Sequence, residues 1–247
     1  MHVELQQVSK KYDSTRVVDS LSLVLPAGCI VSVIGLNGAG KTTLLRCLSG
    51  IVAPSQGTIL YNQEPFHRER LDLRRELMFL PDFPAGFPEM NTLEHAAFLL
   101  RAYERDLTGA QDTILRALAE LDLLALAEVP MAELSRGQLY KCALVGLFAV
   151  APRLWLLDEP FASGLDPQGL AVLKQRARRH AESGGTLLYT TQILEIAAKF
   201  SDRLIVLDHG RVAATYSRED LSAMPASGPE SLEARLRQFR EIGSDET

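Results

Sequence analysis

The sequence predicts an α/β fold in which helices cover a mostly parallel sheet, with an antiparallel β part near the N-terminus and an inserted helical subdomain. Short apolar runs of strand length alternate with segments of helical periodicity, which is the pattern of a parallel sheet. A glycine-rich turn joins one of these runs to a helix. Residues from about 83 to 150 carry three helical patterns with no strand between them, and this block predicts the subdomain.

Length and composition are those of a globular protein. The 247 residues suffice for one large α/β unit with a small subdomain, and the net charge of −5 comes without a block of Lys or Arg, which argues against a nucleic-acid partner. Cys29, Cys47 and Cys142 lie in apolar surroundings without metal-binding spacing, so we expect buried, reduced thiols. The N-terminus is not a signal peptide, and the longest apolar run, 142–151, is too short to cross a bilayer. Any work at a membrane requires docking onto another subunit.

The first part of the chain is predicted to be rich in strands. Alternating or continuous apolar runs predict strands at residues 3–8, 21–25, 29–34, 58–61 and 77–80. A turn follows the second of these at 26–28, a loop occupies 53–57, and a helix is expected over 43–48.

The predicted subdomain opens with a loop at 82–88 that carries Phe83 and Phe87. Three helices follow, at 93–103, up to 121 and at 137–150, and their predicted caps are Asn91 or Thr92, Thr108, and Ser135. The chain then returns to strands and helices in alternation. We expect strands at 154–158, 186–191 and 203–207, helices at 167–182 and 193–200, and a hairpin turn at 208–211.

The C-terminal segment is polar. We divide the chain into a domain at 1–213 and a tail at 214–247. In the tail, one helical face collects Leu232, Leu236, Phe239 and Ile242, which predicts a short amphipathic helix. Docking onto a partner and covering its own domain are both consistent with that face.

The glycine-rich turn at residues 35–42 fits the phosphate-binding loop of nucleotide triphosphatases, with a buried strand before it and a helix after it. Its backbone N–H groups can reach phosphate oxygens, Lys41 can reach the β and γ phosphates, and the Thr42 hydroxyl can hold Mg²⁺. The sequence therefore predicts a P-loop NTPase core. The expected nucleotide contacts here are Gly35, Leu36, Asn37, Gly38, Ala39, Gly40, Lys41, Thr42 and Thr43.

Two further stretches carry chemistry. Asp158 and Glu159 end a buried strand, where Asp158 can orient Mg²⁺ and Glu159 can polarise a water in line with the γ-phosphate. Ser135 and Gly137 begin a helix, and a capped helix N-terminus is a second place where an anion can bind. An ordinary capped helix is the alternative for this second stretch.

Taken together, these motifs resemble the ATP-binding subunit of an ABC transporter over residues 3–213. Residues 35–43 match the Walker A motif of that family, 134–138 its signature, 154–159 its Walker B motif with the catalytic glutamate, and 163–167 its D-loop. The resemblance implies ATP and Mg²⁺ as ligands, with Tyr12 stacking on adenine. It also implies that Asp166 of the D-loop belongs to the nucleotide site.

The resemblance further implies two protein partners. Such subunits pair head to tail, so Ser135, Gly137 and Gln138 would contact the γ-phosphate on the opposite subunit, which is either identical or different. A separate membrane-spanning subunit would dock on the loop around Phe83 and Phe87, unless these side chains belong to the subdomain core. The protein would then lie on the cytoplasmic face of the cell membrane through that subunit.

The sequence departs from the family at three positions. Asp82 stands where the family has glutamine after the strand that follows Walker A; as a carboxylate it is either a direct Mg²⁺ ligand or a structural loop acid, and it favours exporter-type subunits. Arg136 replaces the first glycine of the signature, and we expect its side chain to point to solvent. Gln192 replaces the switch histidine, and a neutral donor predicts slow hydrolysis with Glu159 retained.

The favoured function is an ATP-hydrolysing motor that energises a separate membrane-spanning subunit. The alternative is an ATP-gated clamp or regulator with very low hydrolysis, because Asp82 and Gln192 are both altered. A nucleic-acid-linked or ribosome-linked ATPase is disfavoured by the negative charge and by the lack of a tandem domain or a coiled-coil insertion.

Overall fold

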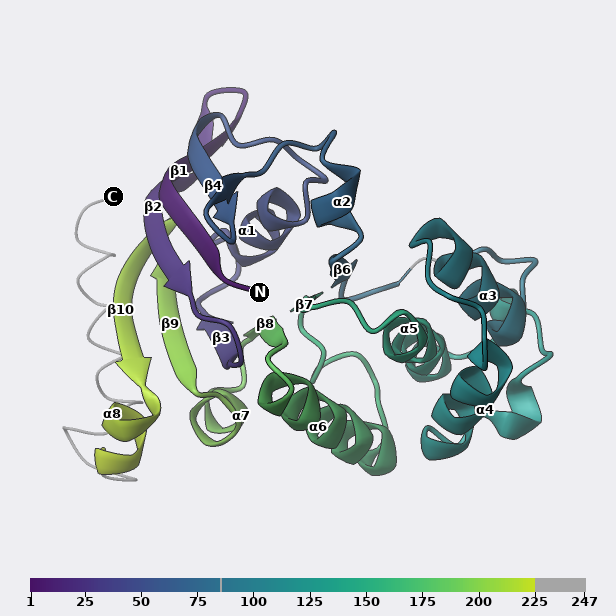
Figure 1. Cartoon of the computed structure of the whole chain (residues 1–247). Helices are drawn as coiled ribbons and strands as arrows, with labels where there is room; N and C mark the ends of the chain where they lie inside the picture. Colours follow the sequence, from purple (N-terminus) through teal and green to yellow (C-terminus); the bar gives the residue numbers. More distant parts are fainter. Residues whose placement is uncertain (85, 225–247) are drawn as a thin grey trace.

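The computed structural model describes residues 1–84 and 86–224, which form two sheets (Figure 1). The antiparallel sheet has the order β2-β1-β4-β5. Its strands are β1 (Val3–Tyr12), β2 (Thr15–Leu25), β4 (Gln56–Tyr61) and β5 (Glu64–Pro65). The larger sheet has the order β10-β9-β3-β8-β7-β6. In that order, its strands are β10 (Arg211–Ser217), β9 (Arg203–Asp208), β3 (Ile30–Ile34), β8 (Thr186–Thr191), β7 (Leu154–Leu157) and β6 (Leu77–Leu80).

Helices cover both faces of the larger sheet and form a separate group at one end of the molecule (Figure 1). They are α1 (Lys41–Leu48), α2 (Leu71–Arg74), α3 (Thr92–Ala102), α4 (Ala110–Glu120), α5 (Arg136–Val150), α6 (Pro167–Glu182), α7 (Leu194–Phe200) and α8 (Arg218–Ala223). Two short 3₁₀ turns, η1 (Leu124–Leu126) and η2 (Met131–Glu133), precede α5.

The core follows from the alternation of side chains along the strands. In β3, Val31 and Val33 face α1 and the antiparallel sheet, whereas Ile30 joins the cluster that contains α5 and α6. All five residues of β3 are buried, as expected for a strand with a layer on each face.

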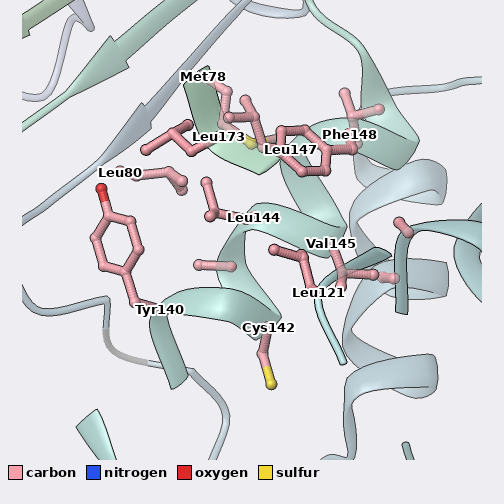
Figure 2. Packing of buried hydrophobic residues seen from close by; sticks show 14 of the residues in the cluster. Met78, Leu80, Leu121, Tyr140, Cys142, Leu144, Val145, Leu147, Phe148 and Leu173 are labelled. Carbon is pink, nitrogen blue, oxygen red and sulfur yellow. The ribbon is translucent and has the colours of Figure 1, made fainter. Parts of the chain in front are cut away.

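Helix α5 connects the helical subdomain to the sheet. Its residues from Tyr140 to Phe148 are buried, and all of them except Lys141 and Gly146 belong to one hydrophobic cluster with Met78 and Leu80 of β6 and with Leu121 at the end of α4 (Figure 2). A helix that is apolar all round is a core helix. The subdomain is therefore packed against the sheet through α5.

The sheet topology brings distant segments to one edge. Strands β3, β8, β7 and β6 pair in parallel, with Ile34 opposite Thr191 and with Leu157 opposite both Tyr189 and Leu80. The segments that follow these strands must then leave the sheet at the same edge. In open parallel sheets this edge is where ligands bind.

The predicted fold class is confirmed, and the structure corrects some details. Thr108 is not the cap of α4: Gly109 occupies the N-cap with a φ of 69°, and the Thr108 N–H is bonded instead to the Asp106 carboxylate. Of the two predicted caps of α3, Asn91 is the one that the structure shows, and strand β10 runs from Arg211 to Ser217. The predicted amphipathic helix of the tail lies outside the described residues.

Among residues 1–84 and 86–224, no helix combines the length and apolarity that crossing a membrane requires. The three cysteines are buried free thiols, as predicted.

His180 on α6 supplies a test of the packing. Its ring stacks on Trp155 at 4.2 Å between ring centroids, and burial lowers the pKa of His180 from 6.5 to about 4. The unfolded chain takes up a proton near pH 6.5 while the folded chain stays neutral there, so stability falls as the pH drops from about 6.5 to about 4. We predict that His180→Phe, which keeps the stack, loses less melting temperature than wild type over this range. Parallel pH profiles for the two proteins would contradict this account.

Candidate nucleotide site

The phosphate loop folds as its glycines require. Gly38 and Gly40 adopt φ of 85° and 98°, the left-handed region that glycine tolerates best. A Cβ on Gly40 would lie 2.5 Å from the Val17 carbonyl oxygen, and one on Gly35 would lie 2.3 Å from the Leu207 carbonyl oxygen. The loop is thus pressed against β2 and β9, and α1 starts directly after Gly40. This is the cradle at a helix N-terminus that binds phosphate.

The Lys41 side chain is hydrogen-bonded back to the backbone of the phosphate loop. Its Nζ donates to the carbonyl oxygens of Gly35 at 2.8 Å and Leu36 at 3.2 Å, and it lies 3.7 Å from Oε1 of Glu159. The side chain is 8 % exposed. A buried ammonium surrounded by oxygens can exchange these partners for phosphate oxygens.

The Asp158 carboxylate is held from two sides. Thr42 Oγ1 donates to its Oδ2 at 2.7 Å, and Thr190 Oγ1 donates to its Oδ1 at 2.6 Å. Thr190 lies on β8 and is fully buried. Thr190 could not be selected from the sequence, because it meets Asp158 only through the pairing of β8 with β7 in the sheet.

Glu159 follows with a strained backbone, at a φ of 46°. Its N–H donates to Thr190 Oγ1 at 2.9 Å, and its Oε2 accepts from the Gln192 N–H at 3.2 Å. Its Oε1 is buried and has no hydrogen-bond partner among the described residues. Burial raises the pKa of Glu159, and the Lys41 ammonium partly opposes that rise. A carboxylate with a raised pKa and an oxygen that accepts no hydrogen bond is suited to accept a proton.

Gln192 contacts the phosphate loop directly. Its Nε2 donates to Oδ1 of Asn37 at 3.0 Å. Because its backbone N–H also bonds Glu159, this residue joins the ends of β3, β7 and β8. The structure therefore brings together the predicted residues Asn37, Glu159 and Gln192.

The signature residues lie at the N-terminus of α5. Ser135 and Gln138 form a capping box in which the Ser135 side chain accepts from the Gln138 N–H, while the Gln138 side chain accepts from the Ser135 N–H. A Cβ on Gly137 would lie 2.3 Å from the Gly164 carbonyl oxygen, so the helix start and the D-loop touch through their backbones. The predicted helix cap is confirmed.

Asp166 caps α6 through the Gly169 N–H and accepts from Lys141 of α5 at 2.7 Å. The Lys141 side chain is 7 % exposed, and its hydrogen bond lowers the pKa of Asp166. Lys141 is a second residue that sequence reasoning did not select. It ties the D-loop to the signature helix.

Three other predicted residues have exposed side chains. Tyr12 is 40 % exposed near the tip of the hairpin between β1 and β2, with Lys10 Nζ 5.2 Å from its ring centroid. Phe83 is exposed, whereas Phe87 is half-exposed and packs edge to face on Phe98 of α3 at 5.1 Å. Phe87 thus takes part in subdomain packing while Phe83 remains on the surface.

Asp82 and Arg136 form an ion pair at 2.5 Å between Oδ1 and Nη2. The Arg136 side chain is 48 % exposed, in line with the expectation that it points to solvent, and it also makes this ion pair. Its guanidinium, at the N-terminus of α5, is drawn to a carboxylate that also compensates the unfavourable position of a cation there. Asp82 lies two residues after β6, at the same edge of the sheet as Asp158.

The donor set around Thr42 and Asp158 fits Mg²⁺. Both supply hard oxygen atoms, 2.7 Å apart, beside the phosphate loop. Magnesium in such sites is held by one or two protein oxygens together with phosphate oxygens and water. Asp82, the third predicted ligand, pairs with Arg136 through Oδ1.

Comparison with known proteins places the chain in a family. Residues 18–162 match the family model described as ABC transporter. The cytochrome c biogenesis ATP-binding export protein CcmA of Shigella flexneri is 35 % identical over 211 residues, which cover 85 % of this chain and 99 % of that protein. The corresponding protein of Pseudomonas fluorescens is 39 % identical over 173 residues, or 70 % of this chain and 80 % of the other.

Solved structures of ATP-binding subunits have the same fold as this chain. An ATP-binding subunit of an ABC transporter superposes with a TM-score of 0.84 at 29 % identity, covering 89 % of this chain and 91 % of the other. A dimeric ATP-binding cassette bound to ADP and phosphate has the same fold, with a TM-score of 0.79 at 24 % identity over 87 % of this chain and 98 % of that one. The chain belongs to the ABC transporter family, and it is an ATP-binding subunit with ATPase activity. Family membership favours the transport motor over the clamp.

The contact between Gly137 and Gly164 gives a prediction about the site. Gly137→Ala should push the D-loop away from α5, because its Cβ has only 2.3 Å to the Gly164 carbonyl oxygen. We expect a loss of about 1–3 kcal/mol in the free energy of unfolding, as for other overpacked positions, together with a loss of ATPase activity. Chemical denaturation measures the first and phosphate release the second. Arg136→Ala, one residue earlier and half-exposed, is the control that should keep its stability; a fully stable and active Gly137→Ala would contradict the described contact.

Proposed function

We propose that the chain is the ATP-hydrolysing motor of an exporter and contributes half of each shared ATP site. The observation that carries the proposal is the Asp158 carboxylate, which is held between the phosphate loop and β8 with Glu159 directly beside it. Phosphates bind on the loop N–H groups and on Lys41, and adenine stacks on Tyr12. Thr42 and Asp158 would hold Mg²⁺, which would supply positive charge beside the phosphates. Asp82 would add a further ligand.

Hydrolysis depends on Glu159 and Gln192. Oε1 of Glu159, which accepts no hydrogen bond within the described residues, accepts the proton of the attacking water, and the raised pKa of Glu159 favours this. The Gln192 N–H keeps the other oxygen of Glu159 in place, while the Gln192 side chain moves from Asn37 to the γ-phosphate. A neutral amide stabilises the developing negative charge less than an imidazolium would. Turnover is therefore slow.

A second copy or a similar subunit completes the site. In the single chain, Ser135, Gly137 and Asp166 lie together at the N-terminal ends of α5 and α6, and they are joined by the contacts of Gly164 and Lys141. That surface, together with Gln138, binds the triphosphate held by the opposite phosphate loop. The helix N-terminus provides the attraction for phosphate.

A membrane-spanning subunit docks on the loop after β6. Phe83 offers an exposed aromatic side chain, and Phe87 with Phe98 provides a second apolar contact on α3. The loop begins at Asp82, so docking and the nucleotide site share one segment. The protein consequently lies on the cytoplasmic face of the membrane. The relatives are export proteins of cytochrome c biogenesis, and we extend export in that process to this chain.

Two substitutions test the catalytic assignment. In the assembled complex, Glu159→Gln should lower the ATPase rate by about a hundredfold or more, the scale of a lost general base, while ATP binding is kept. Gln192→His should raise the rate, because histidine can present a charged donor to the γ-phosphate. Steady-state phosphate release measures both. An unchanged rate for Glu159→Gln would refute its role as base, and no gain for Gln192→His would refute the slow-switch account.

A further inference from the structure

The turn at 208–211 between β9 and β10 packs against both ends of the phosphate loop. At the start of the loop, the Leu207 carbonyl oxygen leaves no room for a Cβ on Gly35. At its end, Gly210 of the turn donates its N–H to the Ala39 carbonyl oxygen at 3.1 Å. The nucleotide contacts proposed for this chain include no residue of the turn, so any effect of the turn on nucleotide binding passes through the loop.

The bond from Gly210 orients one peptide of the phosphate loop. A trans peptide unit is planar, so its C=O and the N–H of the next residue point in opposite directions. Because the turn holds the Ala39 carbonyl oxygen, the Gly40 N–H is directed away from the turn. Gly40 is a predicted phosphate contact and the N-cap of α1, so this orientation decides where its N–H can meet a phosphate oxygen.

The loop, the turn and β2 meet without room for side chains. Gly40 and Gly210 have φ of 98° and 78°, and a Cβ on either residue would lie 2.5 Å from the Val17 carbonyl oxygen of β2. Strand β10 lies beside β2, although the two strands belong to different sheets (Figure 1). Because the three backbones are in direct contact, a displacement of the turn also displaces the end of the phosphate loop.

Asp19 of β2 holds the turn in place. Its N–H donates to the Gly210 carbonyl oxygen at 2.9 Å, and its Oδ2 lies 2.8 Å from Nε and 2.6 Å from Nη2 of Arg211, the first residue of β10. Its Oδ1 accepts from Nη1 of Arg16 at 2.5 Å. The hydrogen bonds from Arg211 and Arg16 lower the pKa of Asp19, so the carboxylate is charged at neutral pH. The two arginines share one carboxylate, but only Arg211 belongs to the turn.

We propose that Asp19 and Arg211 are positioning residues that hold the phosphate loop, through the turn between β9 and β10, in the conformation that binds the phosphates of ATP. Losing their contact lowers the fraction of the protein whose loop is competent to bind. The chemical step is not affected, because Glu159 and Gln192 follow β7 and β8, which lie on the other side of β3 from β9. This inference rests on the proposed function, since it needs the loop to bind ATP.

Arg211→Gln and Arg16→Gln form a matched pair of variants. Each removes one positive charge and one partner of the Asp19 carboxylate, but only Arg211→Gln releases the turn. We expect Arg211→Gln to raise the Kd for ATP and for ADP by about threefold to tenfold, the factor that one hydrogen bond of ordinary strength provides. Arg16→Gln should raise it by less than about twofold, as expected for a half-exposed ion pair. Arg211→Lys keeps a donor for Asp19 and should recover part of the loss.

Titration calorimetry of the full chain measures these constants, and ATPase kinetics of the assembled complex separate binding from chemistry. Arg211→Gln should raise KM for ATP and keep kcat, the pattern of an interaction that serves ground state and transition state equally. In an Asp19→Asn background, Arg211→Gln should have no further effect, because the contact is already lost. Its melting temperature should stay close to that of wild type, since the Arg211 side chain is 73 % exposed.

Equal shifts of Kd in Arg211→Gln and Arg16→Gln would mean that only the charge matters, and they would overturn the proposal. Wild-type affinity of Arg211→Gln, or a further shift of full size in the Asp19→Asn background, would overturn it as well. Failure of the proposed function has a different signature, because wild type itself would then not bind ATP.

Discussion

The site depends on one shared carboxylate. Asp158 directly follows β7, and its carboxylate accepts hydrogen bonds from the Thr42 hydroxyl of the phosphate loop at 2.7 Å and from the Thr190 hydroxyl of β8 at 2.6 Å. These bonds fix the mutual position of β3, β7 and β8 at the edge where their chains leave the sheet. Because the carboxylate accepts from two hydroxyls, its oxygens are oriented before any cation arrives, which lowers the reorganisation that binding requires. The same arrangement positions Glu159, because its backbone N–H donates to the Thr190 hydroxyl.

The order of strands in the sheet places the loop after β6 and the start of α5 close to this carboxylate. The loop after β6, which carries Asp82 and Phe83, lies next to Asp158 because β6 pairs with β7. Helix α5 begins near that loop at Arg136 and is buried against the sheet over most of its length. Asp82 thus lies beside Phe83 of the surface proposed for the membrane subunit and pairs with Arg136, next to the surface proposed for the second ATP. Two of the three positions that differ from the family pattern, Asp82 and Arg136, lie on these segments, whereas the phosphate loop itself matches the pattern.

Local features were predictable and long-range contacts were not. The phosphate loop, the Ser135 cap and the start of α6 at Pro167 follow from short motifs whose geometry is set by neighbouring residues. Thr190, Lys141 and the Asp82–Arg136 pair acquire roles only when segments 32, 25 and 54 residues apart meet. The prediction that Thr108 caps α4 was wrong for a local reason. Gly109 adopts the left-handed conformation at the N-cap, and the Thr108 N–H donates to the Asp106 carboxylate in the turn before the helix.

The measurement that tests the account most directly is the Mg²⁺ dependence of ATP binding in Thr190→Val. Removing this hydroxyl leaves Asp158 with one of its two holders, so the gain in ATP affinity on adding Mg²⁺ should shrink while binding in EDTA stays unchanged. Thr191→Val is the control, since Thr191 is equally buried on β8 but its hydroxyl accepts a hydrogen bond from the Ile193 N–H. A Thr190→Val protein that keeps the full wild-type gain with Mg²⁺ would contradict the central role of the shared carboxylate.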